Sequence, residues 1–202
     1  FTLDGELEQP YCVVYPAEAS RTEGDVTEGE EVVEPEPEPA NTVYPVNFLA
    51  EQPYTVGTFA PKAAPMYGYT TEKSMIQMQH LTGVLRLAVK GNGEKVTSIL
   101  IKAEGGKIAG AFTVDCATGA VVAGEEAVNT VTVTFAEPLV LGDEAQVVYA
   151  TVPAGSYGTF MVTINTEAHE KMTVKFNSDV KPINAGTVRE FSAFTYEAND
   201  ND

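Results

Sequence analysis

The chain of 202 residues carries 29 acidic and 12 basic residues, a net charge of −17, and 44% of its residues are hydrophobic. This length suits one large or two small domains, and the acidic surface repels nucleic acid and anionic lipid, so neither is expected as a partner. No run of about 18 apolar residues is present, so no transmembrane segment is predicted. Neither an initiator Met nor a secretory signal stands at Phe1, so we expect a processed or truncated piece of a longer precursor.

Residues 1–62 predict a partial β domain that is interrupted by an acidic loop, residues 23–41. Short strands are expected at Phe1–Leu7, Tyr11–Tyr15, Thr42–Leu49 and Tyr54–Phe59. Between them, Glu23–Asn41 alternates Glu with Pro and has no periodic apolar face, which predicts an extended surface loop. Proline separates its carboxylates and no Asp-x-Asp-x-Asp-Gly pattern occurs, so a calcium site is the weaker interpretation of this segment.

The segment 63–74 is predicted to be a linker, and residues 75–202 a C-terminal β-sandwich. The prolines of Ala60–Tyr67 suit a crossing between domains. Short strands separated by glycine-rich turns then predict an all-β fold, an antiparallel sandwich. The expected strands are Met75–Leu81, Val84–Lys90, Val96–Ala103, Lys107–Val114, Val128–Phe135, Gln146–Val152, Tyr157–Asn165, Lys171–Phe176 and Val188–Tyr196.

Alternation within these strands predicts which side chains form the core. Lys171–Phe176 reads KMTVKF, so its apolar residues face one side and Lys171, Thr173 and Lys175 the other. Period two with one apolar face is typical of a sheet that is packed on one side. The same pattern assigns to the core Leu85, Leu87, Ile99, Ile101, Val131, Val133, Phe135, Phe160, Val162, Ile164, Val174 and Phe176.

No cluster of residues predicts catalysis, so the chain is not expected to be an enzyme, and no catalytic, cofactor-binding or metal-binding residue is assigned. His169 lies in a polar stretch that predicts a hairpin tip, and His80 ends an amphipathic strand and is expected to be partly buried. No Gly-x-Ser-x-Gly, His-Glu-x-x-His or phosphate loop occurs. Cys12 and Cys116 form no C-x-x-C motif, so they form a disulfide only if the fold brings them together; buried free thiols are the alternative.

One stretch has a specific order of residues. Gln52–Met66 reads QPYTVGTFAPKAAPM, and HLTGVLRL follows at His80–Leu87. In these residues the chain resembles the fimbrillin-like family of Gram-negative gut and oral anaerobes, whose members carry a Gln-x-Tyr-x-x-Gly-Ser-Phe-like strand, then Ala-Pro-Met, then an alternating Leu-x-Leu. Further segments that match the family in order are Tyr11–Ala17, Val96–Ile101, Ile108–Gly110, Val152–Gly155 and Ile183–Phe191.

The resemblance implies a transthyretin-like β-sandwich and a non-enzymatic structural or adhesive surface protein, either a pilus subunit or a related adhesin. Family members are exported as lipoproteins and lie at the outer membrane or in the fimbrium. Their subunits join by β-strand addition, so the implied partners are other pilus subunits or a second copy, together with a host or bacterial surface ligand. Residues 1–62 supply about four strands where a full sandwich has about seven, so the N-terminal domain is expected to be partial.

The last predicted strand, Val188–Tyr196, is the candidate assembly strand. The family uses C-terminal strands in subunit joining, which the resemblance implies for this segment, and a terminal strand can be exchanged without threading the chain. Its four candidate residues are Val188, Phe191, Phe194 and Tyr196. Alternation places Val188, Ser192, Phe194 and Tyr196 on one side and Phe191 and Ala193 on the other. Two alternatives stay open: an ordinary strand that closes its own sandwich, and a non-polymerising surface module that binds a glycan or a host protein.

Overall fold

The computed structural model describes residues 10–16, 42–72, 75–177 and 182–198, and all regular structure among them is β-strand. The expected strand Phe1–Leu7 and the acidic loop Glu23–Asn41 lie outside these ranges. No helix in the described part of the chain is long and apolar enough to cross a membrane. The strands are β1 (Tyr11–Tyr15), β2 (Val43–Phe48), β3 (Glu51–Pro53), β4 (Met66–Thr70), β5 (Met78–His80), β6 (Thr82–Lys90), β7 (Lys95–Ala103), β8 (Gly110–Asp115), β9 (Ala120–Ala123), β10 (Thr130–Val140), β11 (Gln146–Pro153), β12 (Thr159–Thr166), β13 (Lys171–Asn177), β14 (Val188–Glu190) and β15 (Phe194–Thr195).

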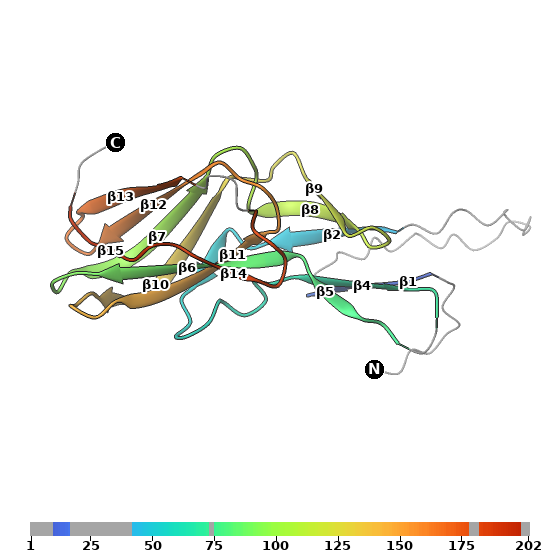
Figure 1. Ribbon diagram of the computed structural model, residues 1–202, viewed down its shortest axis with the longest axis horizontal. Coiled ribbons are helices and arrows are strands. Elements are labelled where there is room, and N and C mark those ends of the chain that lie inside the picture. The colour runs from blue at the N-terminus through green and yellow to red at the C-terminus, as the bar shows by residue number, and fades with distance from the viewer. Residues whose placement is uncertain (1–9, 17–41, 73–74, 178–181, 199–202) are drawn as a thin grey trace, which may run out of the picture.

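Two of the sheets form a larger sandwich (Figure 1). One has the strand order β13-β12-β7-β10-β3, and the other has the order β11-β6-β14, with β15 also paired to β6. The all-β sandwich predicted from sequence is confirmed. Most of the strand pairs are antiparallel, and three are parallel: β3 with β10, β14 with β6 and β15 with β6.

The core of the larger sandwich lies between these sheets and confirms the predicted register. Alternate residues of each strand point inward, as in β12, where every second side chain from Phe160 onward is buried. Nine of the assigned residues are at most 1% exposed: Leu85, Leu87, Ile99, Ile101, Val131, Val133, Phe160, Val162 and Ile164. The other three, Phe135, Val174 and Phe176, are partly buried and pack against the same cluster.

A smaller sandwich extends the larger one, as the right half of Figure 1 shows. Its sheets have the orders β1-β4-β5 and β2-β8-β9, and its core contains Val46, Phe48, Phe112 and Val114. The expectation that all strands from Met75 onward form one sandwich is therefore wrong, because β5, β8 and β9 belong to these smaller sheets. The division into domains at residues 62 and 75 stays a prediction.

The strands that join the two sandwiches are almost continuous. Only Leu81 separates β5 from β6, and only two residues separate β2 from β3. The predicted linker 63–74 contains β4, and the predicted strand Tyr54–Phe59 is instead a turn closed by a bridge between Thr55 and Thr58, with Gly57 at φ 74°. A positive φ at this glycine interrupts the extended backbone that a strand requires.

A buried glutamine closes one open side of the larger sandwich. Gln52 lies in β3 and is 1% exposed. Its Nε2 donates to the carbonyl of Thr151 at 2.9 Å and to that of Leu49 at 3.2 Å, while its Oε1 accepts from the Thr151 N–H at 2.9 Å. Thr151 lies in β11, at the edge of the facing sheet, so the amide supplies the partner that a neighbouring strand would otherwise give.

Truncation of one core residue tests the register. Leu85→Ala is expected to lower the free energy of unfolding by about 2–5 kcal/mol, because it opens a cavity at a fully buried site. Thr132→Ala, on the outer face of β10, is expected to cost less than about 1 kcal/mol. Urea unfolding measures both values; equal losses in the two variants would contradict the assigned faces.

Replacement of the buried amide tests the edge closure. Leucine has nearly the volume of glutamine but no amide, so Gln52→Leu leaves the N–H and C=O of Thr151 unpaired. We expect a loss of about 2–5 kcal/mol in unfolding free energy. Gln77→Ala, at an exposed position, serves as the matched control and is expected to stay within about 0.5 kcal/mol of the parent. An unchanged unfolding free energy in Gln52→Leu would mean that water pairs with the N–H and C=O of Thr151 as well as the amide does.

Candidate functional site

The C-terminal segment, residues 186–197, is held along the free edge of β6. Backbone hydrogen bonds join Gly186 N–H to Thr82 O, Phe191 N–H to Arg86 O and Tyr196 N–H to Lys90 O, at 2.8, 3.0 and 2.8 Å. The predicted single strand Val188–Tyr196 is instead two short strands, β14 and β15. The segment therefore closes the chain's own sandwich at this edge.

One extra residue reverses the predicted alternation of this segment. Glu190 pairs with Arg86 and Phe194 pairs with Val89, so four steps along the segment (190 to 194) face three steps along β6 (86 to 89). Such a bulge moves the following side chains to the opposite face. Phe191 and Tyr196 both point into the core as a result, and the expectation that they face opposite sides is wrong. Val188 is 55% exposed and Phe194 is half-buried.

An aromatic cluster closes the second open side of the larger sandwich. The Phe191 ring lies 5.7 Å from that of Phe160 and 4.6 Å from that of Phe176, and Phe194 lies 5.6 Å from Phe176, measured between centroids. Tyr157 contacts Phe160 at 5.6 Å and donates its hydroxyl to the Pro153 carbonyl at 2.9 Å. Burial raises the pKa of Tyr157 to about 12, so this ring stays neutral within the cluster at physiological pH.

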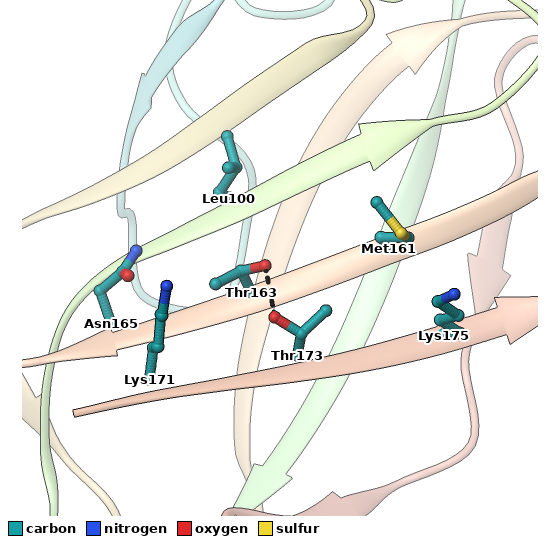
Figure 2. Close-up of a pocket in the computed structure, with 7 residues that line it drawn as sticks. All are labelled: Leu100, Met161, Thr163, Asn165, Lys171, Thr173 and Lys175. Atoms are coloured by element: carbon teal, nitrogen blue, oxygen red, sulfur yellow. Dashed lines mark hydrogen bonds between the residues drawn. The ribbon is translucent and has the colours of Figure 1, made fainter. Parts of the chain in front are cut away.

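A second candidate site lies on the outer face of the five-stranded sheet (Figure 2). Side chains of β7, β12 and β13 border a shallow pocket with a volume of about 880 Å³. Thr163 and Thr173 lie opposite each other with their hydroxyls 2.9 Å apart, and Asn165 Nδ2 donates to Ser98 Oγ at 3.0 Å. The lining residues are Leu100, Met161, Thr163, Asn165, Lys171, Thr173 and Lys175.

The outer face is basic although the chain is strongly acidic. Lys171 and Lys175 line the pocket from β13, and Lys102 shares the face because it lies directly opposite Met161 in the β7–β12 register. Hydroxyl, amide and ammonium groups suit hydrogen bonding and the attraction of anions. The alternation of KMTVKF predicted that Lys171, Thr173 and Lys175 share a side; the neighbouring residues follow only from the strand register.

Of the two histidines, His80 lies beside Gly186, where the C-terminal segment begins, and His169 lies between β12 and β13. His80 is exposed at the end of β5, so the expectation that it is partly buried is wrong; β5 is an edge strand of its three-stranded sheet. His169 is exposed between β12 and β13 with a φ of 63°, as expected of a hairpin tip. Within the described ranges, no group of three or more His, Cys, Asp or Glu residues is placed to hold a metal ion.

Comparisons with known proteins identify the fold. The sequence matches no protein-family model and no curated protein. A structure described as a putative cell adhesion protein from Bacteroides uniformis aligns with a TM-score of 0.50 over 93% of this chain, at 15% identity. Another with the same description, from Bacteroides ovatus, aligns with a TM-score of 0.53 over 96%, at 12% identity. This chain spans 67% and 65% of those two chains, about two thirds of their length.

Proposed function

We propose that the chain is a non-enzymatic adhesive surface protein that assembles by β-strand addition, as fimbrial subunits do. The proteins with a similar fold that are described as putative cell adhesion proteins support the adhesive role. A fimbrillin-like pilus subunit or related adhesin, exported as a lipoprotein to the outer membrane, is the specific form that the sequence resemblance favours. Its partners in assembly would be further subunits or a second copy of the chain.

The observation that carries this proposal is the way the C-terminal segment is bound. It pairs only with β6 among the described strands, and β14 and β15 contribute just three and two residues to the sheet. Removal of the segment would leave an unpaired edge on β6 and a groove shaped for Phe191, Phe194 and Tyr196. The same segment of a second subunit would fit that groove, because it has the same sequence. Binding of this kind between two copies is strand exchange.

A single charge in the segment tests this proposal. Phe194→Asp is expected to abolish cross-linked oligomers while the monomer still unfolds cooperatively, because Phe194 is only half-buried in its own chain. Chemical cross-linking and size-exclusion chromatography measure assembly, and circular dichroism measures unfolding.

Thr195→Asp is the matched control, since Thr195 is the exposed neighbour of Phe194 and should leave assembly intact. If Phe194→Asp unfolds the isolated monomer, the segment serves only its own core and the exchange mechanism is wrong. Assembly of the Phe194→Asp variant at the parent level would also contradict the mechanism.

A second candidate function rests on the basic outer face. The two threonine hydroxyls, the Asn165 amide and the lysines of β7 and β13 could bind an anionic glycan or an acidic protein surface without any assembly. This is the non-polymerising surface module that the sequence left open. The positive charge of this face, in a chain of net charge −17, is what favours it.

Charge reversal tests the outer face, with heparin as an anionic glycan probe. Lys102→Glu combined with Lys175→Glu is expected to weaken binding about 3- to 30-fold at low salt, the effect of losing two exposed charge contacts. Lys90→Glu combined with Lys107→Glu reverses two exposed lysines outside this face, so it changes the net charge by the same amount and is the matched control. An equal loss in both variants would show that total charge, not this face, attracts the probe.

A further inference from the structure

The fold brings together the two cysteines of the chain. Cys12 is in β1, and Cys116 directly follows β8, so they come from the two facing sheets of the smaller sandwich. Cys116 is 1% exposed in the core of this sandwich, and Cys12 packs against the same cluster. Both thiols are free, and a side-chain hydrogen bond joins them.

Backbone contacts on both sides hold the two sulfur atoms in this arrangement. Cys12 lies opposite Tyr69 in the antiparallel β1–β4 register. The Cys116 N–H donates to the Thr42 carbonyl at 2.8 Å. Asp115 begins the turn that follows, because its Oδ1 accepts from the Ala117 N–H at 3.0 Å. The thiols are therefore neighbours because of the fold, and their contact does not depend on a mobile loop end.

We propose that Cys12 and Cys116 are an oxidisable pair that forms a disulfide staple across the smaller sandwich when the chain meets a disulfide oxidant. The thiolate of one cysteine attacks the oxidant's S–S bond and releases one thiol; the second cysteine then displaces the other half as a second thiol. One S–S bond forms between the two Sγ atoms, and two electrons and the two S–H protons pass to the reduced oxidant.

The surroundings of the pair set the order of the steps. Burial raises the pKa of both thiols, with a smaller contribution from the nearby Asp115 carboxylate, and the pKa of Cys116 reaches about 12; the hydrogen bond to Cys116 partly offsets the rise for Cys12. Thiolate is therefore scarce in the folded chain at neutral pH, and oxidation accelerates as the pH rises. Cys12 is the less buried of the two, so it is the residue that an external oxidant reaches first.

The disulfide would stabilise the half of the molecule that has the smaller hydrophobic core. The described core of the smaller sandwich has seven buried residues, compared with 22 in the larger one. Among the described strands, β1 pairs with β4 alone, over five residues. A covalent link from β1 to the end of β8 closes a loop of about 100 residues, which strongly restricts the unfolded chain. Oxidation is thus expected to stabilise this half of the molecule against opening.

The intact chain in its reduced form, and the same chain incubated with oxidised glutathione, provide the test. Alkylation in denaturant followed by mass spectrometry should find no free thiol in the oxidised chain and one intramolecular bond between Cys12 and Cys116. The Tm of the oxidised chain should exceed that of the reduced chain by about 5–15 °C. Cys12→Ser and Cys116→Ser are the controls; neither should gain stability on oxidation.

Because the main comparison uses one sequence in two redox states, it does not depend on any variant folding. Two alkylatable thiols after prolonged oxidation at pH 9 would overturn the proposal. So would an oxidised product that consists of intermolecular dimers, a bond that forms only after denaturant is added, or an oxidised chain with a lower Tm than the reduced one.

Discussion

A sandwich whose wider sheet faces a narrower one has two open sides, and in the larger sandwich side chains from short strand segments close both. On one side, the Gln52 amide pairs with the N–H and C=O of Thr151 and so satisfies the edge of β11. On the other side, Phe191 and Phe194 cover the gap beside β13. The polar closure satisfies backbone groups, and the aromatic closure excludes water from the core.

These two closures differ in how they connect to the rest of the chain. Gln52 lies between β2 and the turn at Gly57, so the chain holds it from both ends. The aromatic closure comes from residues 186–197, whose two short strands pair only with β6 among the described strands. In the proposed assembly, the side closed by residues 186–197 is therefore the one that would accept a strand from a second subunit.

Sequence periodicity predicts the strands and their inward faces well, but it predicts poorly which strands pair with each other. Alternation in Thr159–Thr166 and Lys171–Asn177 reveals the strands and their inward faces, because the period depends only on the strand itself. It does not reveal that β8 pairs with β2, since pairing depends on distant segments. Phe191 and Tyr196 share a face because four residue steps in the C-terminal segment pair with three in β6, which the sequence of the segment alone does not show. Gln52 is a polar residue that sequence reasoning would place at the surface, and its burial is explained only by its hydrogen bonds to Thr151.

The near-continuous passage of β5 into β6 and of β2 into β3 has a mechanical consequence. Most strands run along the long axis of the molecule (Figure 1), and the hydrogen bonds between them lie across that axis. A tensile force along the axis therefore loads many hydrogen bonds in shear at the same time, instead of opening them one after another. Force that enters the smaller sandwich passes directly through Leu81 into β6, the central strand of its sheet, without a hinge in which the two halves could separate.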